Sequence, residues 1–335
     1  MNRQNLPPEF EMMKIIMSEW ISKPVYVAAK LGLSDLLSKK NRHVDELAEL
    51  TATHADSLYR MMRALASVGI YKEHEDHVFG NTPMSESLME GGLKSIALMF
   101  HSGWHSAAWN NLFYSIQTGK PAFEKIHGEP IFNWLNNNPQ ALRVFNEANS
   151  IKAAKTHRLI VEVYDFKRFK TITDVGGGIG GLMVEILKAN PHLSGVVADL
   201  PETVSAIKTR IPKSDIGDRM QVITIDFFKS IPKGSDVYLL SHILHDWPDE
   251  KCIRILRNCK YAMSPHGKLL IVEGIIKQKN IFSIAKQLDL EVFLMGGGRE
   301  RTEKEYGELL KQAGLSLAKV VSTPDYISVI EAVCE

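Results

Sequence analysis

The spacing of hydrophobic residues changes character near residue 165. Up to that point, apolar residues recur every three to four positions, which is typical of amphipathic helices. This spacing predicts two short helices over Val44–Leu50 and Ala55–Ser67, followed by a hairpin between Ile70 and Phe79. We therefore expect the first half of the chain to be helical, with the helix–helix–hairpin order of a winged helix.

Beyond residue 165, short β-branched runs alternate with helical stretches. This alternation predicts a parallel sheet with helices on both faces. A turn at Thr323-Pro324-Asp325 joins the last two runs, so the final strand is expected to be antiparallel. The predicted fold is α/β, with strands near 171–175, 195–200, 220–226, 236–241, 268–276, 317–322 and 326–333.

The length of 335 residues exceeds one ordinary domain of ~100–200 residues. We expect a helical domain over 1–100, a helical linker over 101–164 that contributes to a binding pocket, and the α/β domain over 165–335. The amphipathic stretch Phe10–Val27 needs burial outside a monomer, which predicts a homodimer. The run Ser95–Gly119 carries no charged residue, but its histidines, asparagines and serines exclude a membrane span, so we expect it to be buried in protein.

Charge and cysteine content narrow the function further. The net charge of +1, from 40 basic and 39 acidic residues, gives no field that attracts nucleic acid or an anionic membrane. Asn41–Ser95 holds five basic and nine acidic residues, a net charge of −4, which argues against a DNA-binding winged helix. Three cysteines without a Cys-x-x-Cys pair exclude a disulfide framework and a zinc ribbon. The opening residues lack a signal-peptide core, so a cytoplasmic protein is expected.

A glycine-rich turn over 174–181 follows the first strand of the α/β half. Gly176, Gly178 and Gly181 match the dinucleotide spacing G-x-G-x-x-G, and glycines let a backbone approach a ligand closely. Asp199 lies at the end of the next strand, 23 residues beyond Gly176, where a carboxylate can bind ribose hydroxyls. The turn therefore predicts a nucleotide-like cofactor.

Two features favour S-adenosylmethionine over a nicotinamide dinucleotide. Asp174 precedes the glycines, where an acid repels a pyrophosphate but suits a ligand with an amino group and a sulfonium. Asp226, followed by Phe227, ends the third strand, where an acid can accept from adenine and a ring can cover the base. Because ligands of such sheets bind at the carboxyl ends of the strands, Asp174, Asp199 and Asp226 are expected to line one cofactor site.

His245 is the candidate catalytic residue. It follows the fourth strand in the run Ser241–Pro248, at the same sheet edge as the glycine turn. Glu273 ends the fifth strand, and Glu300 lies in a loop before a capped helix. If the three converge, the carboxylates orient the imidazole and stabilise its charged form while His245 accepts a proton.

These motifs resemble those of small-molecule O-methyltransferases of the plant caffeate, flavonoid and hydroxyindole type, and still more closely their bacterial relatives that act on phenazines, anthracyclines and other aromatic secondary metabolites. The resemblance covers nearly the whole chain. It rests on VYVAAKLGLSDLL, HVDELAELT, LYRMMRALASVGIY, DVGGGIGG, ADLPETV, DFF, LLSHILHDWPDEKCIRILRNC, LLIVEG and GGRERTEKEYGELLKQAG. It implies a Rossmann-like, seven-stranded methyltransferase sheet behind an all-helical, winged-helix-like dimerisation domain.

The resemblance also implies roles by position. His245 corresponds to the general base, and Glu273 and Glu300 to the acids that flank it. Plant members usually carry Lys near the adenine four residues before the base; this chain has Ser241, which we place with the cofactor contacts. Those contacts are Asp174, Gly176, Gly178, Asp199, Leu200, Asp226, Phe227 and Ser241.

The expected reaction moves a methyl group from S-adenosylmethionine to a hydroxyl of an aromatic acceptor and leaves S-adenosylhomocysteine. No metal is expected: His101 and His105 lack a third ligand, and Mg²⁺-dependent catechol methyltransferases lack a His base of this kind. The acceptor is expected to contact Phe100, Trp104, Phe145, Asn149, Lys152 and Met295.

Four alternatives stay open from the sequence. One is methylation of a nitrogen or carbon of a similar acceptor, and another is a member of the same fold that does not methylate. A nicotinamide-dependent dehydrogenase and a winged-helix transcription factor are the others. Asp174 argues against the dehydrogenase, and the net charge of −4 over Asn41–Ser95 argues against the transcription factor.

Overall fold

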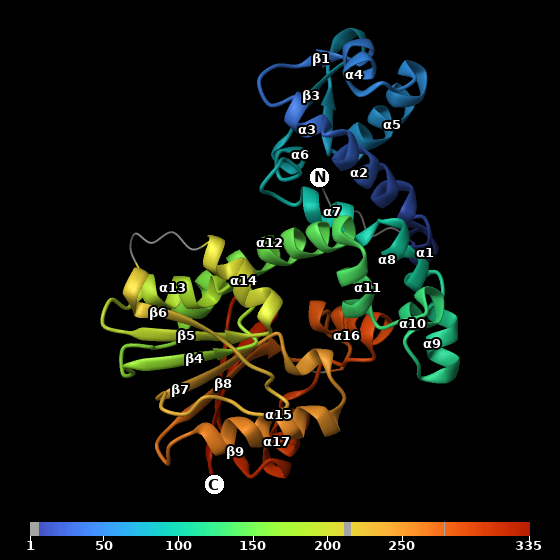
Figure 1. The fold of residues 1–335 in the computed structure, drawn as a ribbon. Helices are drawn as coiled ribbons and strands as arrows, with labels where there is room; N and C mark the ends of the chain where they lie inside the picture. Colours follow the sequence, from blue (N-terminus) through green and yellow to red (C-terminus); the bar gives the residue numbers. More distant parts are fainter. Residues whose placement is uncertain (1–6, 211–215, 278) are drawn as a thin grey trace. The chain divides into compact units, whose positions relative to one another are not determined.

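The computed structural model describes residues 7–210, 216–277 and 279–335 (Figure 1). The chain divides into two compact units. One comprises the chain through Ala107 together with Leu135–Ile151, and the other comprises Ala108–Trp134 together with Lys152–Glu335. The predicted linker 101–164 is thus shared between the two units.

The first unit combines helices with a small sheet. The two predicted helices are present as α4 and α5, and the predicted hairpin is formed by β2 and β3, where Tyr71 pairs with Asn81. A third strand, β1, pairs Arg42 with Phe79, so this three-stranded sheet departs from the expected all-helical domain. The elements are α1 (Pro8–Ile16), α2 (Glu19–Leu31), α3 (Leu33–Leu36), β1 (Arg42–His43), α4 (Val44–Thr51), α5 (Ala55–Ser67), β2 (Tyr71–Glu73), β3 (Val78–Asn81), α6 (Pro83–Glu86), α7 (Lys94–Phe100) and the start of α8 (Gly103–Trp109).

Apolar side chains from both kinds of element form the core of this unit. Helices α4 and α5 have hydrophobic residues on one face because their apolar positions follow the helical repeat. That face packs on the hairpin, and the fully buried residues are Leu33, Leu47, Met62, Leu65 and Phe79. Burial of such side chains contributes ~1.5–3 kcal/mol each.

The second unit is built on a seven-stranded sheet with strand order β6-β5-β4-β7-β8-β10-β9. The first five strands are parallel, and β10 is antiparallel to both β8 and β9, which confirms the prediction for the final strand. The strands are β4 (Thr171–Val175), β5 (Ser194–Asp199), β6 (Met220–Thr224), β7 (Val237–Ser241), β8 (Lys268–Gly274), β9 (Leu315–Ser322) and β10 (Ile327–Cys334).

Helices cover both faces of this sheet, as predicted (Figure 1). On one face, α13 (Gly181–Ala189) buries Leu182, Met183 and Ile186 against the strands. On the other, α15 (Asp249–Ala262) and α17 (Glu303–Gln312) bury a second cluster that includes Ile255, Leu256 and Leu310. Strands that are covered on both faces have nearly continuous apolar sequences, which explains why these strands could be predicted from the sequence.

The remaining helices are α9 (Leu112–Thr118), α10 (Ala122–His127), α11 (Ile131–Asn137), α12 (Pro139–Val163), α14 (Pro201–Arg210) and α16 (Ile284–Gly296). The expectation that the charge-free run Ser95–Gly119 is buried is wrong for α9: Phe113 is 72% exposed and Ile116 is 63% exposed, whereas Ser115 is buried. A short helix buries one face only, and composition does not show which one. No helix among the described residues has the length and apolar character to cross a membrane.

Candidate active site

The glycine turn joins β4 to α13 in a left-handed backbone conformation. Gly176, Gly178 and Gly180 have φ angles of 73°, 55° and 78°, which residues with a Cβ rarely adopt. The backbone N–H of Gly178 donates to Asp199 Oδ2 at 2.8 Å, and the N–H of Leu200 donates to Asp199 Oδ1 at 2.7 Å. The predicted carboxylate therefore lies at the turn and is held in place by the backbone.

Asp174 lies inside β4 and is buried beneath the turn. Its Oδ1 atom has no hydrogen-bond partner among the described residues. Burial, followed by the charge of Asp199, raises the pKa of Asp174 to about 7. A buried carboxylate without a donor costs free energy, and a cationic ligand group would remove that cost.

The third acid, Asp226, follows β6, which neighbours β5 in the sheet. Asp226 Oδ1 accepts from the backbone N–H of Phe228 at 3.0 Å, and Asp226 Oδ2 lies 3.3 Å from Lys229 Nζ. The Phe227 ring lies so close to Gly176 that a Cβ there would be 3.4 Å from Phe227 Cε1. The structure therefore brings Asp174, the turn, Asp199 and Phe227 together at one sheet edge.

The two other predicted cofactor residues lie at the ends of neighbouring strands. Leu200 directly follows β5, and its side chain is 52% exposed. Ser241 is the last residue of β7, which pairs with β4. Their contact with a cofactor stays a prediction.

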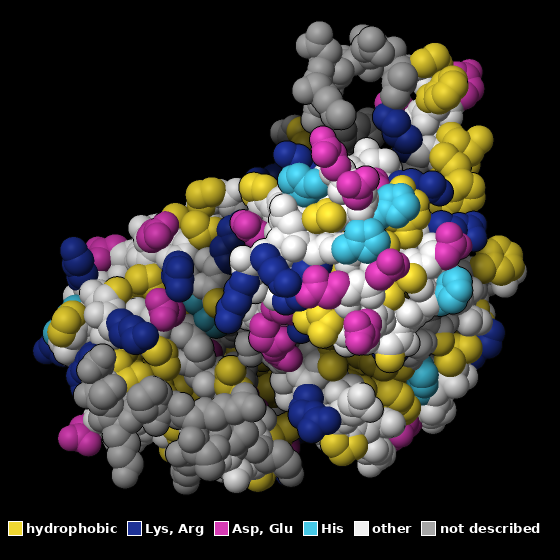
Figure 2. Space-filling model, turned by 90° about the horizontal axis from the view of Figure 1, so that it is seen from above, with side chains coloured by type: hydrophobic (Ala, Val, Ile, Leu, Met, Phe, Trp, Pro, Cys, Tyr) yellow, Lys and Arg dark blue, Asp and Glu magenta, His cyan; other side chains and the backbone are white. Residues whose placement is uncertain are grey.

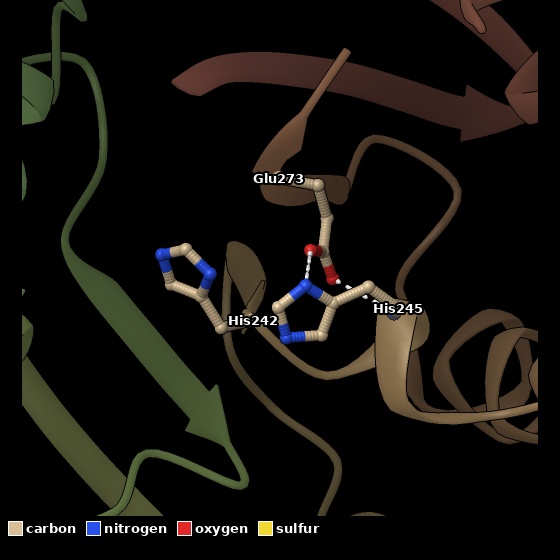
Figure 3. Close-up of side chains that lie close together, drawn as sticks. All are labelled: His242, His245 and Glu273. Carbon is tan, nitrogen blue, oxygen red and sulfur yellow. Dashed lines mark hydrogen bonds and ion pairs between the residues drawn. The ribbon is translucent and has the colours of Figure 1, made fainter. Parts of the chain in front are cut away.

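His245 lies in a single 3-10 turn, Leu244–Asp246, after β7. Its Nδ1 lies 2.8 Å from Glu300 Oε1 and 3.3 Å from Glu273 Oε2, and both carboxylates are buried. Figure 3 shows Glu273 reaching the His245 ring, with the His242 ring beside them. The three predicted catalytic residues are therefore assembled, leaving Nε2 as the ring nitrogen that does not face these two carboxylates.

Backbone hydrogen bonds fix this constellation. Glu273 Oε1 accepts from the N–H groups of Ile243 and Leu244 at 3.0 and 2.8 Å. The loop 299–301 holds the turn from its other side: Arg299 N–H donates to His245 O at 2.8 Å, and Glu300 contributes its carboxylate. Backbone N–H groups therefore hold the Glu273 carboxylate, and the loop 299–301 brings the Glu300 carboxylate to the His245 ring.

Arg301 completes this support. The guanidinium is buried and donates to Leu244 O and Trp247 O, both at 3.1 Å, on either side of His245. It also pairs with Asp249 at the start of α15 at 2.6 Å. A bidentate cation of this kind pre-organises the loop that carries the imidazole.

Electrostatics make His245 a strong base. Burial by itself lowers the pKa of the imidazole, but the charges of Glu273, Asp246 and Glu300 outweigh it and raise the pKa of His245 to about 10. Burial raises the pKa of Glu273 to about 7, against the opposing charge of His245.

The six predicted acceptor residues fall in both units. Phe100 lies in α7, Trp104 in α8, and Phe145 and Asn149 in the part of α12 that belongs to the first unit. Lys152 and Met295 belong to the second unit. Their convergence on an acceptor stays a prediction.

Several functional candidates were missed from the sequence. His242, Gly298 and Arg301 stand within motifs that the sequence analysis quotes. His242 has a φ angle of 55°, an uncommon value for a residue with a Cβ. A second histidine three residues before His245 was the only available signal, because backbone strain is not visible in a sequence.

Comparison with known proteins decides the family. The profile of an O-methyltransferase domain matches residues 109–316, and that of an O-methyltransferase dimerisation domain matches residues 13–91. The chain belongs to the O-methyltransferase family. The dehydrogenase and transcription-factor alternatives are thereby set aside.

Individual relatives align over nearly the full length. The phenazine O-methyltransferase PhzM of Lysobacter antibioticus is 38% identical, over 96% of this chain and 95% of its own. The phenazine-1-carboxylate N-methyltransferase of Pseudomonas aeruginosa is 30% identical, over 97% of each. The crystal structure of LaPhzM superposes with a TM-score of 0.93, at 37% identity and over 98% of this chain and 100% of that one.

The cofactor follows from the same comparison. The O-methyltransferase NcsB1 of neocarzinostatin biosynthesis was solved with S-adenosylhomocysteine and 1,4-dihydroxy-2-naphthoic acid. It is 32% identical, with a TM-score of 0.81, over 94% of this chain and 96% of its own. This methyltransferase accordingly uses S-adenosylmethionine as its cofactor.

Proposed function

We propose that this methyltransferase transfers the methyl group of S-adenosylmethionine to a hydroxyl of an aromatic small molecule of secondary metabolism, with His245 as general base. The observation that carries the proposal is the buried Glu273–His245–Glu300 group, with distances of 3.3 and 2.8 Å to His245 Nδ1. Two carboxylates on Nδ1 favour a tautomer in which Nε2 is the accepting atom.

The residues of the glycine turn suit the cofactor. Bound S-adenosylmethionine supplies an activated methyl group. Asp199 would hold the ribose hydroxyls, and Asp226 with Phe227 would hold the adenine. The buried Asp174, whose Oδ1 has no partner among the described residues, favours the positively charged end of the ligand. A pyrophosphate would be repelled there.

His245 acts on the proton of the acceptor. A phenol ionises near pH ~10 and the pKa of His245 is raised to about 10, so proton transfer between them is nearly balanced in free energy. Glu273 and Glu300 stabilise the imidazolium that forms. The unprotonated fraction of His245 grows with pH, so the rate is expected to rise as the pH approaches 10.

The aromatic character of the acceptor is supported by the relatives. PhzM is named for phenazines, and NcsB1 was solved with a naphthoic acid. Methylation of a nitrogen is the second candidate, because the P. aeruginosa relative is named as an N-methyltransferase. His245 favours oxygen, since a ring nitrogen with a lone pair needs no base.

The homodimer is part of the same proposal. The match to a dimerisation domain over residues 13–91 supports it, as do the exposed apolar residues of α1 and α2.

Basic side chains are interspersed with acidic ones on the described part of the face drawn in Figure 2, in keeping with the expectation that nucleic acid is not a partner.

The test is methyl transfer with labelled S-adenosylmethionine and a panel of phenols, hydroxyphenazines and hydroxynaphthoates. We expect His245→Ala to lower turnover by ~10²–10⁴-fold at pH 7. The loss should shrink above pH ~10, where solvent ionises the phenol. His266→Ala, which removes an exposed histidine of the same unit, is the matched control. A His245→Ala enzyme with more than half of the wild-type rate at pH 7 would overturn the assignment of the base.

A further inference from the structure

The proposed base and two side chains beside it form a second kind of site. His242, His245 and Glu273 each offer one metal-ligating atom, and these atoms all lie within 4.8 Å of one another. Figure 3 shows the two imidazoles and the carboxylate grouped together, all within the second unit. Two imidazole nitrogens and one carboxylate oxygen are a donor set that zinc and related transition ions prefer.

Each of the two carboxylates at this group has one oxygen without a hydrogen-bond partner among the described residues. Glu273 Oε2 and Glu300 Oε2 are buried and have no hydrogen-bond partner among the described residues. The other oxygen of Glu273 is fixed by the backbone N–H groups of Ile243 and Leu244. The carboxylate therefore cannot turn to find another donor, and a cation beside Oε2 would satisfy it.

One edge of the group already has the dimensions of a zinc site. Glu273 Oε2 lies 3.3 Å from His245 Nδ1. Two ligands of a tetrahedral Zn²⁺ with bonds of ~2.0–2.1 Å lie ~3.3–3.4 Å apart. The third candidate ligand is His242, which offers a nitrogen within 4.8 Å of the ligating atoms of the other two residues.

The backbone of His242 brings its ring to this place. Its N–H donates to Val272 O at 3.1 Å, and its φ angle of 55° departs from the strand before it. The ring centroids of His242 and His245 are 5.3 Å apart.

We propose that His242, His245 and Glu273 form a binding site for a divalent transition ion such as Zn²⁺, and that occupation of this site inhibits the enzyme. The inhibitory part rests on the proposed function. An ion on Nδ1 takes the lone pair there, and the proton that Nδ1 shared with Glu300 is released to solvent. The neutral ring then carries its remaining proton on Nε2, where no lone pair is left to accept one from the acceptor.

Co²⁺ titration of the full-length protein tests the site directly, because Co²⁺ replaces Zn²⁺ in nitrogen- and oxygen-ligated sites and absorbs visible light. His242→Asn is the test variant, since Asn tolerates a positive φ angle and its amide is a poor ligand. His266→Asn removes an exposed histidine and serves as the matched control. Mg²⁺ is the control ion, because it prefers oxygen ligands.

We expect one Co²⁺ per wild-type chain with a tetrahedral absorption band. Binding in His242→Asn should be weaker by at least ~10–100-fold, which is the loss that removal of an outer-shell partner already causes. Binding to the control variant should equal that to wild type. Zn²⁺ should inhibit the wild type, each enzyme being compared with its own metal-free rate, and should inhibit His242→Asn more weakly. Equal Co²⁺ affinity in wild type and His242→Asn, or no tetrahedral band in wild type, would overturn the site.

The binding measurement does not depend on finding an acceptor. If no acceptor is methylated, the proposed function fails while the Co²⁺ titration still decides on the site. If methylation is found and Zn²⁺ binds at His242 without inhibition, the site stands and the blocked-base consequence is wrong.

Discussion

At the scale of single residues, close backbone approach controls the proposed base. Gly298 packs against the carbonyl of His245 so tightly that a Cβ there would clash with this oxygen and lie 3.0 Å from Asp246 Cα. The φ angle of Gly298 is not in the left-handed region, so the requirement for glycine is steric. Glycine is needed at position 298 because the loop that carries Gly298 packs directly against the backbone of His245 and Asp246.

Gly298→Ala is therefore expected to displace the turn that carries His245. Turnover should fall by at least ~10-fold, since a shift of the base by ~1 Å is costly in positioned catalysis. The binding of S-adenosylhomocysteine, measured by calorimetry, should change little. Gly296→Ala is the control: its Cβ meets nothing within 4 Å, and its φ angle is ordinary. Equal turnover in the two variants would contradict this account.

Asp199 is the residue on which cofactor affinity should depend most. Its carboxylate is positioned by two backbone N–H groups, those of Gly178 and Leu200. Asp199→Asn removes the charge from the bonds to the ribose, and a charge-assisted hydrogen bond contributes ~1.5–3 kcal/mol. S-adenosylhomocysteine should bind ~10–150-fold more weakly by calorimetry. Asp218→Asn, at an exposed position of the same unit, should bind like the wild type.

At the scale of elements, the Glu331 side chain links β10 to the segment that follows α12. Its Oε2 accepts from Tyr164 Oη at 2.7 Å and from Arg168 Nη2 at 2.8 Å, and its side chain is 5% exposed. Burial by itself raises the pKa of Glu331, but the hydrogen bonds from Tyr164 and Arg168 outweigh it and lower the pKa. The carboxylate therefore stabilises the fold in its charged form.

The lowered pKa of Glu331 determines how its contribution to stability changes with pH. A group whose pKa is lowered in the folded state stabilises it fully above the unfolded value of ~4.3, and loses this contribution as the pH falls through the lowered value. Glu331→Gln should reduce the free energy of unfolding by ~1.5–3 kcal/mol at pH 7. The difference from wild type should narrow below pH ~4, which urea titrations at several pH values measure. Glu308→Gln, at an exposed glutamate, should show no such pH dependence.

The start of a helix can be predicted from local sequence when a side-chain cap is present. Thr302 and Glu305 form a capping box at the start of α17, with the Glu305 carboxylate accepting from Thr302 N–H at 2.8 Å. The sequence predicted a helix from Thr302 because such a cap needs only residues three apart.

At the scale of the whole molecule, the prediction concerns assembly. Ile15, Ile16 and Trp20 are 68%, 67% and 70% exposed in the single chain, on helices α1 and α2. Apolar residues grouped in this way mark an interaction surface. Because residues 13–91 match a dimerisation domain, a second copy of the chain is the expected partner.

Light scattering should therefore give twice the chain mass of 37.6 kDa, near 75 kDa. Replacing Ile16 and Trp20 together by Asp should shift the protein toward the single-chain mass, because charged residues are costly in a buried interface. Tyr261→Asp, at a residue that is 76% exposed in the second unit, is the control and should leave the mass unchanged. A single-chain mass for the wild type at micromolar concentration would refute the homodimer.

Much of this protein was determined by its sequence alone. The strands of the α/β half, the glycine turn, the capped helices and the winged hairpin were all predicted, because each depends on residues within a few positions of one another. The residues Asp174, Asp199 and His245 were also found from their places after strands, since parallel strands present their carboxyl ends at one edge.

The tertiary structure decided what depends on long-range packing. It determined the strand order, with β4 between β5 and β7. It also brought Glu273 and Glu300 to His245, although they lie 28 and 55 residues further along the chain. It determined that Phe113 is exposed, that residues 101–164 divide between two units, and that His242 joins the site. Such features arise when segments far apart in the chain compete for the same burial and the same hydrogen bonds, and no local pattern records the outcome.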